Sequence, residues 1–202
     1  MRLFTFLLLE ILLGPITLTG YALLSLWSLS ISRQKQLSVT ALSPLFCRWL
    51  LHIQGIRPDP TADKLMQTIP SLNTGLNWAT IGPTLFAMNV SGFTPSVFNV
   101  APPGKENLGN MINTRTLFFD KALSKYLSTV EQIVILGAGF DTRLFKFCLD
   151  RGLSLFEVDQ IQTQQVKQQA LRKSNVELDE ITFVAVDFKT ENWIDSLLSS
   201  GF

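Results

Sequence analysis

The sequence predicts an α/β protein in which a transmembrane helix precedes a parallel sheet. Three short apolar runs, Gln132–Leu136, Leu153–Asp159 and Ile181–Asp187, predict strands, and segments of helical composition separate them. Strands that alternate with helices at this spacing build a parallel sheet with right-handed crossovers. Near the N-terminus, the 22 residues from Ile11 to Ser32 carry no charge. This length is sufficient for a membrane span, because a helix needs about 20 predominantly apolar residues to cross the hydrocarbon core.

Charged residues are distributed unevenly along the 202-residue chain. Residues 1–104 hold nine charged side chains, and residues 105–202 hold twenty-four. Such a division predicts two regions in different environments. We expect a transmembrane anchor at 1–35, a cap region of helices and loops at 36–109, and a half-domain built on the parallel sheet at 110–202.

The composition excludes several classes of function. A hydrophobic content of 47% excludes a disordered chain. A net charge of +1 argues against a dedicated nucleic-acid binder, which normally carries a basic surplus. One histidine, His52, and two scattered cysteines, Cys47 and Cys148, leave no cluster for a zinc site and no disulfide framework. We therefore expect neither a bound metal nor a nucleic-acid partner.

The N-terminal apolar segment has two alternatives to a membrane anchor. A cleavable signal peptide usually has an apolar stretch of about 7–15 residues, whereas this run is longer and Arg33 and Lys35 follow it at once. A buried core helix would show a polar face, and this run has none. We therefore predict insertion into a membrane through residues 3–32.

The basic residues around this segment predict its orientation. Arg33, Lys35, Arg48 and Arg57 follow the span, and only Arg2 precedes it. By the positive-inside rule, such an asymmetry keeps the flanking chain in the cytoplasm. We therefore expect a single-pass membrane protein whose sheet domain is cytoplasmic.

Two segments follow the anchor. Residues 38–56 predict a helix after Pro44, lying either at the membrane interface or on the soluble domain; its proposed apolar face consists of Leu45, Trp49, His52 and Ile53. We expect His52 to be structural, because it has no evident catalytic partner. Residues 65–104 carry no charge, and their glycine and proline spacing predicts an interrupted, turn-rich segment. That segment could cover a substrate pocket, lie against lipid, or pack as a long loop.

Two further amphipathic helices are predicted in the second half of the chain. The first should precede the first strand, with an apolar face of Phe119, Ala122, Leu123, Tyr126 and Leu127. The second should begin at a capping Thr190 and bury Trp193, Ile194, Leu197 and Leu198.

Ligands of parallel sheets bind at the carboxyl ends of the strands, and three strand ends here carry suitable residues. Gly137-Ala138-Gly139 follows the first strand, and its glycines would let a ligand approach the backbone closely. Asp159 comes 22 residues after Gly137, near the usual offset of a carboxylate that accepts both ribose hydroxyls. Asp187 could accept from an adenine amino group while the Phe188 amide meets a ring nitrogen. This arrangement favours a nucleoside ligand.

The glycine pattern indicates which nucleoside cofactor fits. A dinucleotide fingerprint has a third glycine beside the pyrophosphate, and that position is Thr142 here. No Walker lysine pattern occurs, so a nucleoside triphosphate has no cradle. A nucleoside without phosphates fits better, and S-adenosylmethionine is the common cofactor of that kind. A nicotinamide oxidoreductase is an alternative, against which Thr142 counts.

Three motifs together resemble a known family. They are Arg115–Asp120 (RTLFFD), Ile133–Arg143 (IVILGAGFDTR) and Phe156–Gln160 (FEVDQ). They are similar to motifs of the leucine carboxyl methyltransferase family, which contains many bacterial S-adenosylmethionine-dependent O-methyltransferases. The resemblance covers roughly residues 110–190 and implies the N-terminal half of a doubly wound, Rossmann-like class I methyltransferase sheet. The preceding span is similar to a membrane-anchored bacterial branch.

The resemblance also implies residue roles. Arg115 would hold the methionine carboxylate of the cofactor through a bidentate contact. Gly137, with Ala138 and Gly139, would line the methionine moiety. Asp159 would accept the ribose hydroxyls, and Asp187 with Phe188 would hold the adenine.

Structural alternatives exist for these residues. Arg115 could pair with Asp120 on its own helix, Asp159 could cap the helix that follows it, and Asp187 could stand at a helix start. We expect Asp141 and Arg143 to pair and to hold the glycine loop.

A complete fold of this class has seven strands, of which only three are predicted here, and the Trp-Glu-Gly motif of the fourth has no match. We therefore expect part of a longer methyltransferase, unable to methylate by itself, and we name no catalytic residue. The expected acceptor is a carboxylate or hydroxyl of a small molecule or protein. A non-catalytic, nucleoside-binding membrane protein is the alternative.

Overall fold

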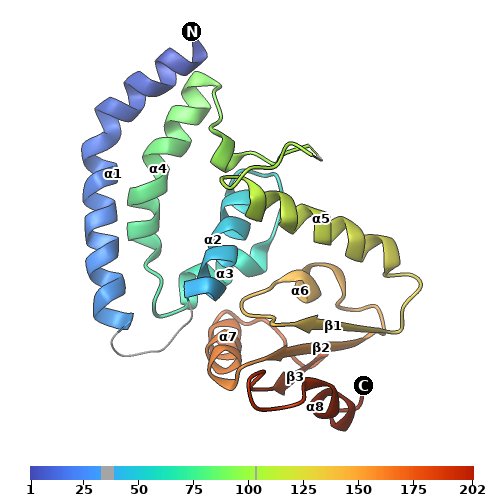
Figure 1. Cartoon of the computed structure of the whole chain (residues 1–202). Coiled ribbons are helices and arrows are strands. Elements are labelled where there is room, and N and C mark those ends of the chain that lie inside the picture. The colour runs from blue at the N-terminus through green and yellow to red at the C-terminus, as the bar shows by residue number, and fades with distance from the viewer. Residues whose placement is uncertain (33–38, 103) are drawn as a thin grey trace. The chain divides into compact units, whose positions relative to one another are not determined.

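The computed structural model describes residues 1–32, 39–102 and 104–202 (Figure 1). The chain forms two compact units, and each unit combines two separate stretches of sequence. The first unit contains Met1–Gln36 and Pro70–Met111, and the second contains Leu37–Ile69 and Ile112–Phe202. Part of the expected cap region, residues 37–69, therefore belongs to the unit that contains the sheet.

The first unit is built on two antiparallel helices, α1 (Arg2–Ser32) and α4 (Thr74–Ser91). The ring of Phe6, near the start of α1, lies 5.1 Å from the ring of Phe93, just after α4. Farther along α1, a β-carbon placed on Gly20 would lie only 2.8 Å from the carbonyl carbon of Ala79. The two helices therefore contact each other closely, and α4 ends beside the beginning of α1. A short 3₁₀ turn, η1 (Ser96–Phe98), follows.

Helix α4 corrects the expectation that residues 65–104 are turn-rich. It is continuous over 18 residues although Pro83 lies inside it. Asn73 caps its start by accepting a hydrogen bond from the amide of Leu76 (3.0 Å), and Gly92, in the left-handed conformation with φ of 66°, ends it. Packing against α1 and capping at both ends outweigh the weak helix propensities of glycine and proline, which the sequence pattern had emphasised.

Gly20 is expected to be required for this helix pair. Gly20→Leu should lower the melting temperature of the chain in a non-ionic detergent, because the added side chain would displace the backbone of Ala79. Gly14→Leu is the matched control, since no heavy atom lies within 4 Å of the position of a β-carbon there. Circular dichroism melts measure both. Equal melting temperatures for the two variants would contradict the close contact.

The second unit contains the predicted parallel sheet (Figure 1). Its strands are β1 (Gln132–Leu136), β2 (Ser154–Asp159) and β3 (Ile181–Ala185), in the order β1-β2-β3 with both pairs parallel. Leu136 lies opposite Val158, and Asp159 lies opposite Ala185, so all three strands end at the same edge. The sequence predicted the three strands correctly, except that β3 ends at Ala185, two residues before the expected Asp187.

Helices cover both faces of the sheet. On one face, Leu144 and Cys148, from α6 (Arg143–Phe147) and its C-terminal end, pack on Ile133 and Leu155. On the other face, Leu197 of α8 (Trp193–Ser199) packs on Phe156 and other apolar residues. Helix α7 (Ile161–Lys173) connects β2 to β3 and contacts the first face through Lys167, described below. This is the mixed α/β arrangement of a partial Rossmann-like fold.

Three other helices of the second unit bring polar residues toward the sheet. They are α2 (Val39–Ile53), α3 (Pro60–Thr68) and α5 (Met111–Tyr126). Leu45 and Trp49 of α2 are fully buried, as the predicted apolar face requires. Of the two places considered for this helix, the structure favours packing on the soluble domain, because Arg48 bonds to Asp141 of the glycine loop.

Two predicted helix faces need correction. In α5, Leu123 and, just after the helix, Leu127 pack on the apolar core as predicted, whereas Phe119 and Tyr126 are exposed. The fully buried residues of the helix are polar: Asn113, Thr116 and Asp120. The reason is that this part of α5 faces arginines of the same unit, since Arg143 bonds to both Thr116 and Asp120. In α8, Asn192 and not Thr190 caps the helix, and of the four expected apolar residues only Leu197 is fully buried.

Candidate cofactor-binding site

The turn after β1 exposes backbone at the edge where the strands end. Gly137 and Gly139 both have positive φ values, 61° and 51°, which L-residues rarely adopt. A β-carbon on Gly139 would contact Ala41 of α2 at 3.4 Å, whereas no heavy atom lies within 4 Å of the corresponding position on Gly137. Gly137 is therefore the open member of the pair, and it leaves room for a ligand beside the backbone.

Asp159 lies directly beside this turn. One carboxylate oxygen accepts a hydrogen bond from the amide of Gly139 at 2.5 Å, and the other accepts from the amide of Gln160 at 2.6 Å. A carboxylate has about four acceptor positions, so each oxygen retains capacity for another donor. The capping role considered as an alternative is not observed, because α7 has no side-chain cap and its N-cap residue is Gln160. The side chain instead joins β2 to the glycine turn.

Asp187 and Phe188 follow the third strand at the same edge. The amide of Val186 donates to the carbonyl of Asp159 at 2.9 Å, which places the two strand ends side by side. Asp187 and Phe188 are exposed. Asp187 does not start a helix, since α8 begins six residues later with Asn192 as its cap. The structure thus brings the glycine turn, Asp159 and Asp187 together.

Arg115 of α5 is exposed, and its guanidinium carbon lies 5.6 Å from the centre of the Phe119 ring. Pairing with Asp120, the structural alternative, is wrong: Asp120 accepts from Arg57 at 2.5 Å and from Arg143 at 2.9 Å. Among the residues that the structure describes, Arg115 forms no ion pair. Its guanidinium therefore keeps its donors for a ligand, and its role in holding a carboxylate stays a prediction.

Asp141 anchors the glycine loop to the rest of the unit. Its carboxylate accepts from Arg48 at 2.5 Å, from the side chain of Arg143, and from the amide of Arg143 at 2.8 Å. Burial alone would raise the pKa of Asp141, but Arg48 and Arg143 lower it below its usual value. The expected pair of Asp141 and Arg143 is confirmed. The contribution of Arg48 was missed, because its position suggested a membrane-flanking charge.

A second buried cluster supports the loop from the side of α3. Arg57 donates to Asp59 and Asp120, and its side chain is only 1% exposed. The hydroxyl of Thr142 donates to Asp59 at 2.5 Å. The residue at the third position of a dinucleotide fingerprint is therefore a buried threonine held by an acid. Arg48 and Arg57 both lie inside the fold, so they do not contribute to the positive flank expected after the span, and Arg33 and Lys35 lie outside the described residues.

Glu157 and Lys167 form a third buried charge cluster, which was not predicted from the sequence. The Lys167 ammonium donates to both carboxylate oxygens of Glu157, at 2.6 and 2.7 Å, and to the backbone carbonyl of Asp141 at 2.5 Å. The side chain of Lys167 is 0% exposed, and that of Glu157 is 1% exposed. Burial raises the pKa of Glu157, and Lys167 opposes this shift. Lys167 thus connects α7, β2 and the glycine loop.

His52 and the cysteines have structural surroundings. The Nδ1 atom of His52 accepts from the amide of Asp59 at 2.9 Å, so this ring fixes the start of α3. Cys148 is buried, and Cys47 is partly buried. Within the described part of the chain, no group of three or more histidine, cysteine, aspartate or glutamate side chains is arranged to hold a metal ion.

The geometry defines a mixed α/β protein in which an open glycine turn and two acids meet at the carboxyl ends of parallel strands. The family model for leucine carboxyl methyltransferases matches residues 85–202, which is more than half of the chain. The chain therefore belongs to the leucine carboxyl methyltransferase family.

Relatives from bacteria agree with this assignment. A protein of Mycobacteroides abscessus is 35% identical over 97 residues, 47% of this chain and 32% of the relative. A protein of Bacillus subtilis is 37% identical over 91 residues, 44% of this chain and 30% of the relative. A protein of Mycolicibacterium paratuberculosis is 29% identical over 150 residues, 73% of this chain and 44% of the relative. All three are named as S-adenosyl-L-methionine-dependent methyltransferases.

These alignments cover less than half of the length of each relative. S-adenosyl-L-methionine is the cofactor that the family implies, as the sequence predicted. The residues at the strand ends fit it: the open position at Gly137 leaves room beside the backbone, and two acids on adjacent strands remain able to accept hydrogen bonds.

Proposed function

We propose that the strand ends of the second unit bind S-adenosyl-L-methionine for O-methylation of a carboxylate or hydroxyl acceptor. The observation that supports this most directly is the junction of the Gly139 amide with the Asp159 carboxylate, beside the end of β3. In this proposal Asp159 accepts from the ribose hydroxyls, and Asp187 and the Phe188 amide hold the adenine. Gly137 lines the methionine moiety, and Arg115 holds the methionine carboxylate.

The bound cofactor would supply a methyl group already activated on a sulfonium. The residues of this chain then need to bind it, orient it and exclude water. We assign no catalytic residue, and the acceptor stays a proposal at the level of chemical class. A nicotinamide dinucleotide is disfavoured, because buried Thr142 occupies the position of the third glycine and its hydroxyl is bonded to Asp59.

Asp159→Ala is expected to weaken binding of S-adenosyl-L-methionine by about 10- to 100-fold, since each hydrogen bond to a charged group contributes roughly 1.5–3 kcal/mol. Isothermal titration of the purified chain with the cofactor measures this. Asp179→Asn is the control, because Asp179 is an exposed acid of the same unit. Equal affinities for the Asp159 variant and the control would contradict the proposed site. Absence of binding by the unmodified chain would contradict the cofactor assignment for this chain.

We further propose that this chain is a membrane-anchored member of the family, with its methyltransferase unit in the cytoplasm. One helical segment, Arg2–Trp27, is long and apolar enough to cross a membrane, and only 11% of its most apolar 18 residues are buried. A core helix would be mostly buried, so that alternative is disfavoured. Retention of residues 1–32 on the mature protein, measured by mass spectrometry of the membrane fraction, tests the anchor against a cleaved signal sequence. Whether the chain crosses the bilayer is a separate question, because α1 is paired with α4.

A further inference from the structure

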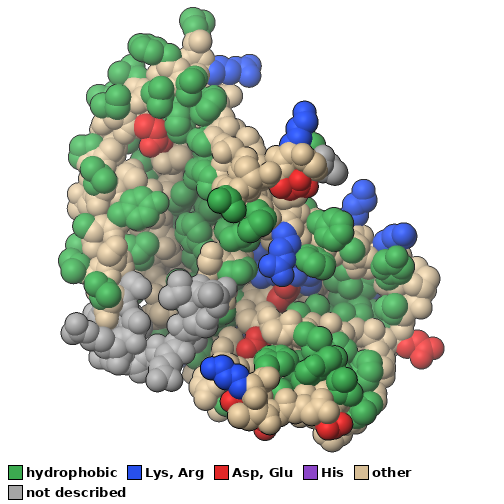
Figure 2. Space-filling model, viewed as in Figure 1, with side chains coloured by type: hydrophobic (Ala, Val, Ile, Leu, Met, Phe, Trp, Pro, Cys, Tyr) green, Lys and Arg blue, Asp and Glu red, His purple; other side chains and the backbone are tan. Residues whose placement is uncertain are grey.

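The exposed side chains of α1 indicate the medium that surrounds this helix. Apolar side chains are exposed along its whole described length, among them Phe4, Ile11, Leu18 and Leu26. Figure 2 shows hydrophobic side chains distributed over this part of the first unit. A protein partner covers one face of a helix, whereas α1 is apolar on every side that α4 leaves open. Helices that are apolar all round occur in protein cores or in lipid, and α1 is not in a core.

The charge of the helix pair points to the same medium. Residues 11–32 carry no charge, and neither do residues 65–104, which contain all of α4. Only Arg2 and Glu10 are charged in the two helices together. Hydrocarbon suits a helix pair whose two charges both lie within the first ten residues of α1, because the rest of the pair places no ionised group in lipid. A lipid bilayer is therefore the partner that fits this surface.

The connections of the chain restrict how the pair can meet a bilayer. Residues 37–69 and 112–202 share one unit, joined by ion pairs such as that of Arg48 with Asp141, so both stretches must lie on the same side of a membrane. The chain enters α4 from this unit. At about 1.5 Å per residue, the 18 residues of α4 are about 27 Å long, close to the thickness of the hydrocarbon core. If both helices crossed, residue 92 would emerge on the opposite side.

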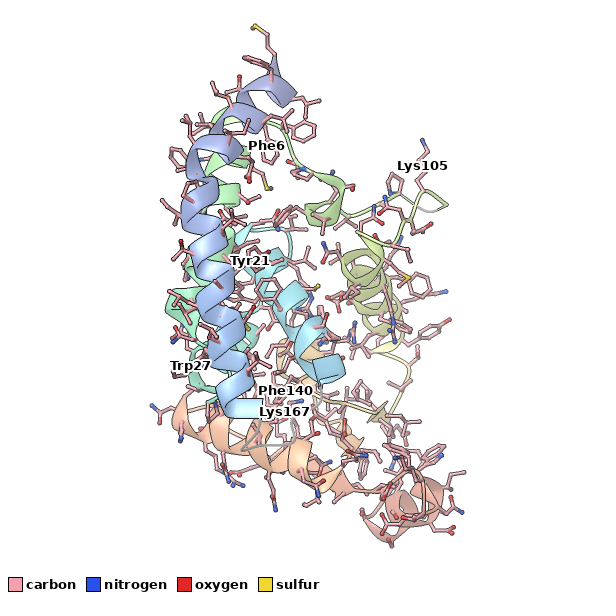
Figure 3. The ribbon with its side chains drawn as sticks, turned by 60° about the vertical axis from the view of Figure 1, so that its left-hand side comes forward. Phe6, Tyr21, Trp27, Lys105, Phe140 and Lys167 are labelled. Atoms are coloured by element: carbon pink, nitrogen blue, oxygen red, sulfur yellow. The ribbon has the colours of Figure 1, made fainter. Side chains whose placement is uncertain are left out.

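The segment between α4 and α5 cannot return through lipid. In the described residues of 92–110 the only regular structure is the three-residue turn η1, and most of their side chains are exposed, including those of Lys105 and Glu106. Lys105 lies away from α1, as Figure 3 shows. Irregular backbone exposed to hydrocarbon does not occur, because its amides and carbonyls would have no hydrogen-bond partners. A single crossing by α1 alone is also incompatible with the structure, since α4 is paired with α1 as far as Phe6.

We propose that the α1–α4 pair lies within one leaflet of a bilayer and that the chain does not cross the membrane. This inference rests on the proposed membrane attachment and not on cofactor binding, and it replaces the single crossing expected from the sequence. In this arrangement α1 faces the acyl chains, and residues 92–111 stay on the same side as the methyltransferase unit. The protein is then monotopic.

Cysteine labelling in cells that produce the full chain tests the topology. Thr94→Cys reports on the far end of the helix pair, and Glu177→Cys reports on the second unit; both side chains are exposed. The unmodified chain gives the background, because burial raises the pKa of both native thiols, that of Cys148 to about 11. A membrane-impermeant maleimide should label both variants in inverted membrane vesicles and neither in intact cells. Labelling of Thr94→Cys in intact cells, with Glu177→Cys protected, would show a crossing and overturn the proposal.

A charge substitution tests the contact with lipid. Leu12→Lys/Leu18→Lys should reduce flotation of the chain with phosphatidylcholine–phosphatidylglycerol vesicles at least tenfold, because both leucines are exposed on α1 and a lysine within lipid is unfavourable. Glu177→Lys is the control for added positive charge on the second unit. Failure of the unmodified chain to float, together with a dimeric mass in solution, would show that a second copy covers the helix and would overturn membrane attachment itself. Flotation of the unmodified chain, together with cysteine labelling that shows a crossing, would overturn only the monotopic arrangement and not membrane attachment.

Discussion

Asp141→Asn is expected to lower the free energy of unfolding by about 3–5 kcal/mol, the range found when one partner of a buried ion pair is removed. Asparagine has nearly the same shape, so the change removes charge and leaves packing intact. Arg48, whose side chain is 7% exposed, would lose the only ion pair that it forms among the described residues. Arg143 would keep Asp120. The cost therefore comes mainly from the uncompensated charge of Arg48.

Urea unfolding of the chain in a non-ionic detergent, followed by circular dichroism, measures this difference. Asp179→Asn is the control, because it removes the same charge from an exposed position and should change stability by less than about 0.5 kcal/mol. If Asp141→Asn lowered the free energy of unfolding no more than this control, the ion pair of Arg48 with Asp141 would not stabilise the glycine loop.

The effect of Asp141 should depend on pH in one direction. Burial alone would raise its pKa, but Arg48 and Arg143 lower the pKa of the folded state. The unfolded chain has the ordinary value of about 3.9. The contribution of Asp141 is therefore complete above about pH 4 and is lost as the pH falls through the depressed folded value. The stability difference between the unmodified chain and Asp141→Asn should be constant near neutral pH and shrink in acid.

The sequence predicted the sheet and the residues at its carboxyl edge because those signals are local. The β1 strand and the glycine turn are adjacent in sequence, Asp159 ends β2, and Asp187 comes two residues after β3. Parallel strands end at one edge, so local motifs were sufficient to predict that Gly137, Asp159 and Asp187 come together.

The buried ion pairs that join distant segments could not be predicted in this way. Arg48 and Asp141 are 93 residues apart, and Arg57 and Asp120 are 63 residues apart. Nothing in the local pattern separates an arginine that flanks a membrane span from one that is buried beneath a loop. The same limit affected α5, whose polar stripe faces arginines from distant segments.

Glu157 did carry a signal in the sequence. It lies between apolar residues of β2, a strand covered on both faces, where side chains are buried whichever way they point. A carboxylate in such a position requires a buried cation. The helix immediately after β2 provides Lys167, ten residues later. The pair was therefore predictable in kind, although the third contact of Lys167, with the carbonyl of Asp141, was not.

Lys167→Met is expected to be the second strongly destabilising change, at about 3–5 kcal/mol near neutral pH. It leaves the Glu157 carboxylate, 1% exposed, without a cation. Burial raises the pKa of Glu157, and Lys167 limits this increase. Removal of Lys167 should therefore raise the folded-state pKa of Glu157 further. A raised folded pKa gives stability that is present below the unfolded value, about 4.3, and is lost as the pH rises through the folded value. Urea unfolding should therefore show a loss that grows from acid toward neutral pH.

The double variant Glu157→Met/Lys167→Met separates the two functions of the lysine. Apolar side chains of similar volume can replace a buried ion pair with little loss of stability, so most of the stability should return and its dependence on pH should disappear. The carbonyl of Asp141 would still lack its donor, at a cost of about 1–3 kcal/mol. Hydrogen exchange at the amides of Gly139 and Asp141 should therefore stay faster than in the unmodified chain, and S-adenosyl-L-methionine should bind more weakly. If the free energy of unfolding, the hydrogen-exchange rates and the cofactor affinity all returned to the values of the unmodified chain, Lys167 would serve only to neutralise Glu157. The glycine loop would then keep its conformation without the bond from Lys167 to the carbonyl of Asp141.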